Sequence, residues 1–131
     1  PLGRIASGGE LARFLLALKV VLHRSNAIPT LIFDEVDSGI GGAVAAAVGE
    51  RLAKLAENVQ VLAITHSPQV ASCAMRHLKI AKSENKNVVT TSVSQLSKDD
   101  RQEEIARMLA GTKITDEARA AAASLMSREG K

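Results

Sequence analysis

The chain is almost without aromatic residues. Of its 131 residues 2% are aromatic, and neither Trp nor Tyr occurs. Surfaces that bind single-stranded nucleic acid by base stacking depend on exposed aromatic rings, so the composition disfavours a site of that kind. Hydrophobic residues nevertheless make up 46% of the chain. That content favours one globular domain whose core consists of Leu, Ile, Val and Ala.

Cysteine and long apolar runs are also scarce. Cys73 is the single cysteine, so no disulfide can form within the chain, as is typical of proteins in a reducing cytosol. No apolar run has the length of a membrane span, and no signal peptide is recognisable. The three histidines are scattered and do not have the spacing of a metal site. We therefore expect a cytoplasmic protein that does not enter a membrane.

The most informative absence is that of a phosphate-binding loop. Such a loop reads G-x-x-x-x-G-K-[ST], and no stretch of the chain matches it. Gly130 and Lys131 could supply the G-K of this pattern, but the first glycine, five residues before Gly130, is replaced by Leu125. The stretch "GTK" at 111–113 has the wrong order. The chain also opens with Pro1 instead of Met. We therefore expect either a fragment or processed piece, or a chain whose residues 1–4 are partly foreign to it, and we expect the phosphate-binding loop on a segment upstream.

The middle of the chain has the pattern of a βαβ unit. The apolar run 30–35 follows a proline and predicts a strand, 41–58 predicts an amphipathic helix, and 59–65 predicts a second strand. This order favours two parallel strands joined by a right-handed crossover. Because the strands are continuously apolar, we expect them to be buried on both faces.

Further elements are expected on both sides of this unit. Ser7 and Glu10 have the spacing of a capping box, so a helix is predicted to begin there and to run to residue 24. After the βαβ unit we expect a short helix, two hairpin strands and two closing helices, over 69–75, 77–83, 87–96, 99–111 and 115–129. The predicted fold class is α/β.

Two adjacent carboxylates end the first predicted strand. Asp34 and Glu35 close the run "TLIFDE", and a glycine-rich turn follows. Ligands of open parallel sheets bind at the carboxyl ends of the strands. There a first carboxylate can hold Mg²⁺, directly or through water, and a second can orient and deprotonate a water. The alternative is a strand that simply ends in two polar residues.

Two further stretches carry residues suited to phosphate. His66 ends the second predicted strand, so it could reach the same phosphate as Asp34 and Glu35; the alternative is a polar loop residue. Ser7, Gly8 and Gly9 open the first predicted helix, where free N–H groups and the helix dipole suit an anion. An ordinary capped helix would have the same sequence.

Taken together, these stretches resemble the motifs of ABC-type ATPases. "ASGGELAR" resembles their signature motif, "LIFDEVD" their Walker B strand with its catalytic Glu, and "ITH" their switch histidine. "DEVD" is similar to the SMC-like branch of chromosome and repair ATPases. "DEVDSGIGG" followed by "THSPQVA" resembles the RecN family of bacterial DNA repair ATPases. The likeness continues through the predicted hairpin and closing helices to about the end of the chain.

The resemblance implies a fold and a set of roles. Residues 1–131 would form the C-terminal lobe of an ABC/SMC-type P-loop ATPase head: a mostly parallel sheet flanked by helices, then a β-hairpin and two closing helices. The N-terminal lobe with the phosphate loop, and the coiled coil, would lie outside it. The implied ligands are ATP and Mg²⁺. Asp34 would bind the metal, Glu35 would polarise the attacking water and His66 would sense the γ-phosphate. Contacts with the ATP of a facing head would come from Ser7, Gly8 and Gly9.

The implied function is an ATPase in DNA double-strand break repair and recombination, in which ATP binding joins two heads and hydrolysis releases them. The implied partners are a second head, the protein's own N-terminal lobe, DNA and a recombinase, in the bacterial cytoplasm at the nucleoid. One departure concerns Gly41, which stands where SMC-type heads carry an Asp, so contacts across the dimer by that loop are not implied.

Two alternatives stay open. The first is another ABC-type ATPase, either an SMC relative or the nucleotide-binding subunit of a transporter. A long heptad-patterned arm upstream would favour the RecN family or an SMC relative, and a short helical insertion would favour a transporter. The second is a non-catalytic interaction module that retains the motifs as scaffolding, which a measurement of ATP turnover would distinguish from an enzyme.

Overall fold

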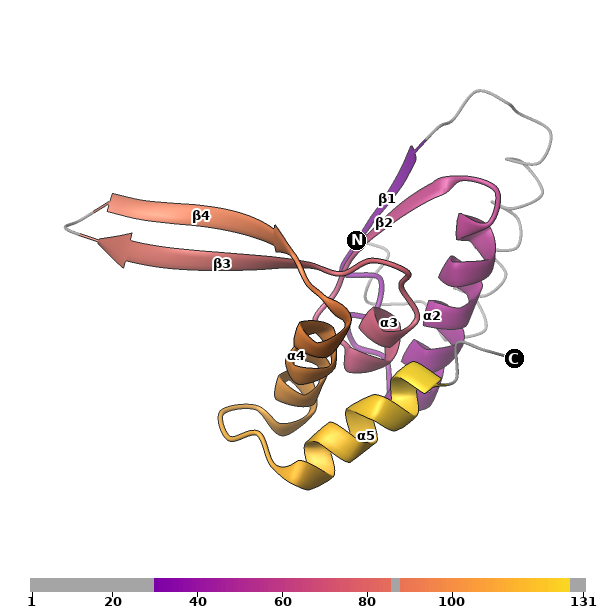
Figure 1. Ribbon diagram of the computed structural model, residues 1–131. Coiled ribbons are helices and arrows are strands. Elements are labelled where there is room, and N and C mark those ends of the chain that lie inside the picture. The colour runs from indigo at the N-terminus through magenta and orange to yellow at the C-terminus, as the bar shows by residue number, and fades with distance from the viewer. Residues whose placement is uncertain (1–29, 86–87, 128–131) are drawn as a thin grey trace.

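The computed structural model describes residues 30–85 and 88–127 (Figure 1). The predicted helix at 7–24 lies outside these ranges, as do Ser7, Gly8 and Gly9. In chain order the described elements are β1 (Thr30–Asp34), α2 (Gly42–Ala56), β2 (Gln60–Ile64), α3 (Pro68–Ser72), β3 (Leu78–Asn85), β4 (Val88–Gln95), α4 (Lys98–Ala110) and α5 (Asp116–Met126). Each element predicted for this part of the chain is present, and the fold class α/β is confirmed.

The βαβ unit has the predicted parallel pairing. β1 and β2 run side by side with Thr30 opposite Gln60 and Asp34 opposite Ile64. α2 turns an apolar stripe inward, and its residues Val48 and Leu52 pack with Phe33 and Val61 of the strands. This first core fixes the two strands against one helix, and thereby fixes where both strands end.

The prediction that the strands are buried on both faces is wrong for this structure. Side chains alternate between faces along a strand, so Phe33 and Val61 face α2 whereas Ile32, Leu62 and Ile64 lie on the opposite face. Ile32 is 67% exposed, Leu62 42% and Ile64 49%. Among the described elements only α2 packs on this two-stranded sheet. An apolar run thus predicts a tendency to be covered, but burial also needs a second layer of structure.

The helices α2 and α3 approach each other closely at Gly49. A Cβ atom built on Gly49 would lie 2.8 Å from Cys73 Sγ and 3.1 Å from the Gln69 carbonyl oxygen. The first distance is far inside van der Waals contact, and the second involves backbone that cannot move independently. Gly49 therefore sets the spacing between the two helices, and α3 carries the chain away from the end of β2.

We expect Gly49→Ala to destabilise the chain by about 1–3 kcal/mol, because the added methyl group overpacks the contact between α2 and α3. Urea unfolding followed by circular dichroism measures the effect. Gly42→Ala is the matched control: its Cβ would lie 3.4 Å from the flexible Gln69 side-chain amide. That variant should be as stable as the parent chain or slightly more stable. Equal unfolding midpoints for the two variants would contradict the close packing at Gly49.

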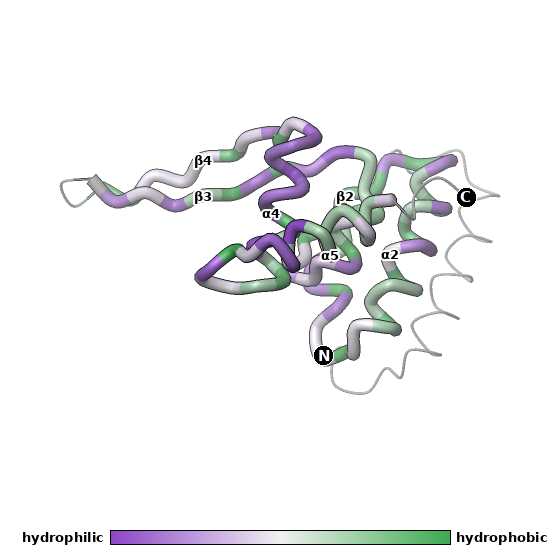
Figure 2. Tube along the Cα trace, turned by 60° about the horizontal axis from the view of Figure 1, so that its bottom comes forward, coloured by the Kyte–Doolittle hydropathy of each residue, from purple (hydrophilic) through white to green (hydrophobic). Residues whose placement is uncertain are grey.

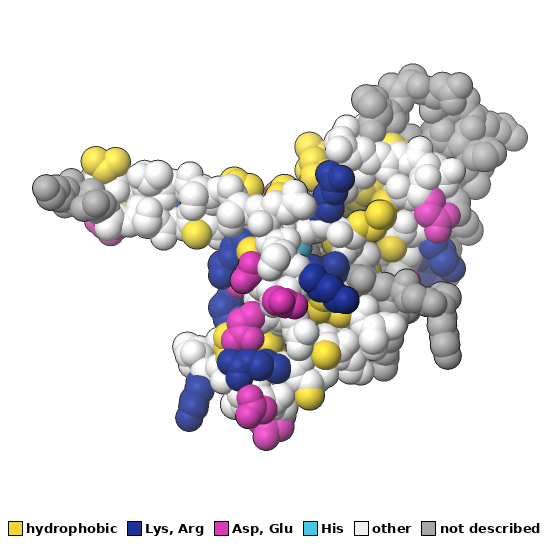
Figure 3. Space-filling view, viewed as in Figure 1, with side chains coloured by type: hydrophobic (Ala, Val, Ile, Leu, Met, Phe, Trp, Pro, Cys, Tyr) yellow, Lys and Arg dark blue, Asp and Glu magenta, His cyan; other side chains and the backbone are white. Residues whose placement is uncertain are grey.

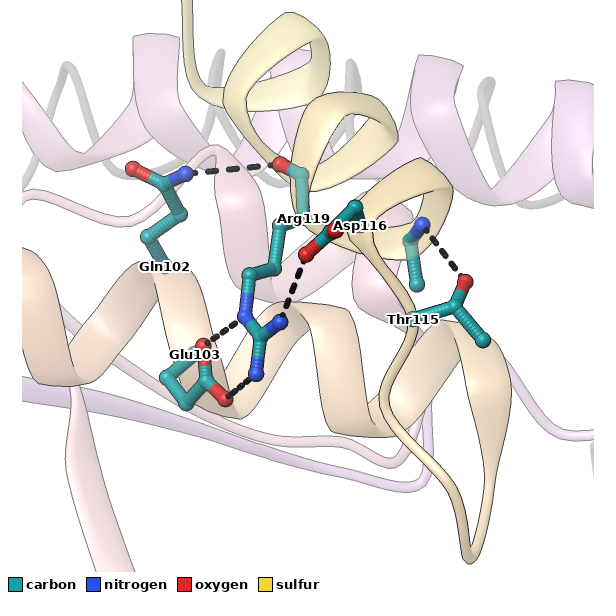
Figure 4. A network of polar contacts seen from close by, with 6 residues as sticks. Gln102, Glu103, Thr115, Asp116 and Arg119 are labelled. Atoms are coloured by element: carbon teal, nitrogen blue, oxygen red, sulfur yellow. Dashed lines mark hydrogen bonds and ion pairs between the residues drawn. The ribbon is translucent and has the colours of Figure 1, made fainter.

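The closing helices form a second core. Ile105, Ala106 and Ala122 are fully buried between α4 and α5. Arg119 of α5 donates to both carboxylate oxygens of Glu103 on α4, at 2.9 and 2.8 Å, and to Asp116 at 2.9 Å (Figure 4). These surface contacts fix the two helices in one arrangement, while the apolar core supplies most of the stabilisation.

Buried charges connect α4 to the elements before it. Arg101 donates to the backbone carbonyls of Ala71 and Ser72 and thus caps the end of α3. Glu104 is 8% exposed and accepts from Lys79 of β3 and from Arg107. Burial alone would raise the pKa of Glu104, but the hydrogen bonds from Arg107 and Lys79 outweigh it and leave the pKa below its ordinary value.

Glu104→Gln should lower the free energy of unfolding at neutral pH by about 1–3 kcal/mol, because it leaves two cations without their anionic partner. A lowered pKa in the folded state means that the stabilisation is present above the unfolded value of 4.5 and is lost as the pH falls through the folded value. The two stability curves should therefore converge in acid. Thermal unfolding between neutral pH and acid measures both. Glu103→Gln, which removes a surface pair, should cost less; an equal cost would contradict the importance of burial.

The strands β3 and β4 form an antiparallel hairpin that projects from the body as a long arm (Figure 1). The hairpin was predicted with strands close to these bounds, but its projection from the body was not. Hydrophobic side chains lie along it (Figure 3), and those of Ile80, Val89 and Val93 are each more than half exposed. Both hydrophobic and hydrophilic residues occur along the arm (Figure 2). No helix in the described part of the chain is long and apolar enough to cross a membrane.

Candidate functional site

The predicted site residues of the two strands lie at one edge of the parallel pair. Asp34 is the last residue of β1 and stands opposite Ile64, the last residue of β2. The Glu35 N–H donates to the Ile64 carbonyl oxygen at 3.1 Å, so the pairing continues one residue past the strand. Thr65 and His66 follow directly on the other side. The parallel register therefore brings the residues that end β1 and those that follow β2 to the same edge of the sheet, as expected of a βαβ unit.

Glu35 has an unusual backbone conformation. Its φ of 49° is the one positive φ of a non-glycine residue in the described ranges. A side chain in this left-handed region costs on the order of 1–3 kcal/mol, and such strain clusters at functional sites. The Glu35 carbonyl accepts from the Ser38 N–H at 2.9 Å, which closes a tight turn. The strand thus ends abruptly and leaves the Asp34 and Glu35 side chains exposed to solvent.

Asp37 is a site residue that the sequence analysis did not single out. It is 4% exposed, and its Oδ2 atom accepts a 2.6 Å hydrogen bond from the Thr65 hydroxyl. Thr65 Oγ1 in turn accepts from the Ser67 N–H at 2.9 Å. Asp37 therefore ties the turn after β1 to the loop after β2. The available signal was the second Asp of "DEVD", which had been interpreted only as a mark of the SMC-like branch.

His66 lies next to this buried carboxylate without bonding to it. Its Nδ1 atom is 4.0 Å from Asp37 Oδ2, which is too long for a hydrogen bond. The His66 side chain is 77% exposed, whereas that of Asp37 is 1% exposed. The imidazole is thus held at the edge of the sheet by its backbone and retains freedom to turn.

The exposed carboxylates at the ends of the strands suit one common mode of Mg²⁺ binding. Across residues 30–85 and 88–127, no group of three or more His, Cys, Asp or Glu side chains is arranged to hold a metal ion. Mg²⁺ in nucleotide sites is commonly bound by one or two carboxylates, several waters and the substrate phosphates, and not by a cage made only of protein. An exposed Asp34 at the end of a strand fits that mode of binding.

Gly39 and Gly41 of the glycine-rich turn differ in whether their backbone conformation favours glycine. Gly39 has a φ of +74°, a value that side chains rarely adopt. Gly41, by contrast, has a φ of −76°, and a Cβ there would meet nothing within 4 Å. The backbone would therefore accept an Asp at position 41. The absence of that Asp is a change in chemistry and not a consequence of the fold.

Comparison with curated proteins gives close relatives. The chain is 48% identical over 126 residues to DNA repair protein RecN of Xylella fastidiosa. The aligned region covers 96% of this chain and 23% of that protein. RecN of Rickettsia felis is 50% identical over 125 residues, covering 95% and 23%. RecN of Streptomyces coelicolor is 44% identical over 126 residues, covering 96% and 22%. The chain thus spans about a quarter of the length of these relatives. No family model matches it.

Comparison with solved structures supports the fold. An SMC ATPase, from work on ATP-driven dimerization and DNA-stimulated activation of SMC ATPases, matches with a TM-score of 0.57 at 17% identity. The match covers 83% of this chain and 65% of the other. At this identity the likeness concerns the fold alone. By sequence this chain therefore belongs to the RecN family, and its fold is that of the C-terminal lobe of an SMC-like ATPase head.

Proposed function

We propose that the chain is part of an ATP-hydrolysing, SMC-like head that acts in DNA double-strand break repair and recombination. In this proposal a longer protein also contains an N-terminal lobe with the phosphate loop and a coiled coil. One observation carries the assignment: the parallel register places Asp34, Glu35 and His66 at the same edge of the sheet. The relatives described as DNA repair protein RecN support the process.

The chemistry falls to a small number of side chains. Glu35 is exposed and projects from a strained turn, so its carboxylate can orient a water and accept its proton as that water attacks the γ-phosphate. His66 is exposed on the adjacent loop and can donate to a γ-phosphate oxygen. Asp34 would hold Mg²⁺. The metal ion, when bound, would neutralise charge on the β- and γ-phosphates.

The rest of the nucleotide site is assigned to segments beyond the described ranges. We assign Ser7, Gly8 and Gly9 to the ATP of a facing head, so that ATP joins two heads and hydrolysis releases them. The partners are then a second head, the protein's own N-terminal lobe, DNA and a recombinase, in the bacterial cytoplasm at the nucleoid. The SMC ATPase with a similar fold comes from work on ATP-driven dimerization, which supports a two-head arrangement.

ATP turnover tests this proposal. The full-length protein should release phosphate from ATP in a magnesium-dependent manner, whereas the 131-residue chain alone should not, because it contains no G-x-x-x-x-G-K-[ST] stretch to position the γ-phosphate. Each is measured beside its Glu35→Gln variant. If the full-length protein shows no turnover, the enzymatic proposal is wrong. If the isolated chain shows turnover that depends on Glu35, the division of the site between two lobes is wrong.

A further inference from the structure

We propose that Asp37 is a positioning residue for His66: its buried carboxylate orients the imidazole toward the γ-phosphate when ATP is bound. The inference rests on the proposed function, since it concerns the same site. Asp37 itself need not touch the nucleotide. It acts through His66, and its contribution should vanish when His66 is removed.

The first argument is the position of Asp37 between the two loops. The residue belongs to the turn after β1, yet its Oδ2 atom accepts from the hydroxyl of Thr65, at the end of β2. That hydrogen bond is 2.6 Å long, and it fixes the carboxylate beside the loop that carries His66. His66 Nδ1 is consequently 4.0 Å from the same oxygen. The arrangement holds the Asp37 carboxylate in one place, within reach of the imidazole as the ring turns.

The second argument is an unfilled hydrogen-bonding capacity. Asp37 Oδ1 is buried and has no hydrogen-bond partner among the described residues. A buried polar atom without a partner costs free energy, and most such atoms in native structures gain a donor in some state. His66 Nδ1 lies on an exposed side chain, 4.0 Å from the other oxygen of the same carboxylate, Oδ2, so a turn of the ring would bring it toward the carboxylate. Closure of the Asp37–His66 contact would give this carboxylate a second donor beside the Thr65 hydroxyl.

The third argument is what such a bond does to the ring. The two imidazole nitrogens lie on opposite sides, so a hydrogen bond from Nδ1–H to Asp37 directs Nε2 away from the protein interior. Nε2 can donate to a phosphate oxygen while Nδ1–H donates to Asp37 only in the imidazolium form, in which both nitrogens carry a proton. Asp37 would therefore set the direction in which His66 meets the γ-phosphate. Without Asp37, the exposed ring would sample many orientations.

A double-mutant cycle in the full-length protein tests the inference. Asp37→Asn keeps the shape of the side chain and an acceptor for Thr65, but removes the charge that faces His66. Asp37→Asn and His66→Ala should each lower kcat by on the order of ten- to a hundredfold, the cost of a misplaced group, with little change in KM. The preference for ATP over ADP in equilibrium binding should fall equally in both. The double variant should be no worse than His66→Ala alone.

Two comparisons guard against a purely structural effect. Ser38→Ala, at the exposed neighbouring position, should behave like the parent protein. Thr65→Val keeps both the carboxylate and the imidazole but removes the hydroxyl that fixes Asp37 Oδ2. It should reduce kcat in the parent protein and have no effect in the His66→Ala background. This variant provides the test if Asp37→Asn lowers the thermal midpoint.

The outcomes separate the inference from the proposed function. If His66→Ala impairs turnover while Asp37→Asn does not, or if the two losses multiply, Asp37 does not act through His66 and the inference is wrong. If His66→Ala has no effect on turnover or on the ATP preference, His66 has no role and the inference fails with it. An absence of ATP turnover in the parent full-length protein would instead overturn the proposed function.

Discussion

Glu35→Gln in the full-length protein should leave ATP bound but hydrolysed more slowly by roughly two to four orders of magnitude, the usual contribution of a general base. The amide has nearly the shape of the carboxylate and can still hold a water. It cannot accept the proton that the water loses as it attacks. Single-turnover measurement with radiolabelled ATP would report the chemical step separately from product release.

Nucleotide affinity should be retained or increased in the same variant. Asp34 still serves the metal, and the substitution removes one negative charge from the surroundings of the γ-phosphate. Glu50→Gln is the matched control, because Glu50 is an exposed carboxylate on α2. That variant should turn over ATP at the rate of the parent protein. A Glu35→Gln protein that hydrolyses ATP within a few-fold of the parent rate would contradict the assignment of Glu35 as the base.

The secondary structure of the described ranges could be predicted because its signals are local. A continuous apolar run between Pro29 and a glycine-rich turn predicts a short strand, and apolar residues three and four apart predict α2. Strand, helix and strand in that order then imply the parallel pair. The same logic gave the hairpin and the two closing helices. Each of these signals is contained within about twenty residues of sequence.

What could not be predicted depends on neighbours distant in sequence. The run that forms β1 is apolar on both faces, and only the three-dimensional structure shows that Ile32 remains exposed while Phe33 is covered by α2. The long exposed arm is a similar case, because nothing local indicates whether a strand will be covered. Exposure is a property of how layers assemble, and a single segment does not encode it.

The candidate site likewise contains residues that local sequence predicts and one that it does not. Asp34, Glu35 and His66 were recognisable because polar residues at the ends of parallel strands have a known chemistry. Asp37 was missed because an acidic residue in a turn is ordinarily solvated, and its burial depends on Thr65, 28 positions away. The left-handed backbone of Glu35 also leaves no mark in its residue type. Both features belong to the three-dimensional structure of the turn after β1.

Ser7→Arg should abolish ATP-dependent association of two heads while sparing ATP binding to a single head. The proposed site places Ser7, Gly8 and Gly9 against the nucleotide of the facing head, where small residues and free backbone N–H groups are needed. An arginine side chain would occupy the space that the facing nucleotide requires. Because Ser7 contacts the partner's ATP and not its own, the nucleotide affinity of one head should not change.

Sedimentation of the Glu35→Gln protein, with and without Ser7→Arg, provides the measurement. Glu35→Gln with saturating ATP should sediment as a dimer through its heads, since the trapped nucleotide cannot be hydrolysed. Adding Ser7→Arg should return it to the species seen without ATP, whereas the matched change Ser7→Ala, which leaves room for the nucleotide, should preserve most of the association. If the dimer persists with Ser7→Arg, or if Glu35→Gln never associates on binding ATP, these residues do not form a site shared by two heads, because a nucleotide held by one head alone would be indifferent to the residue at position 7.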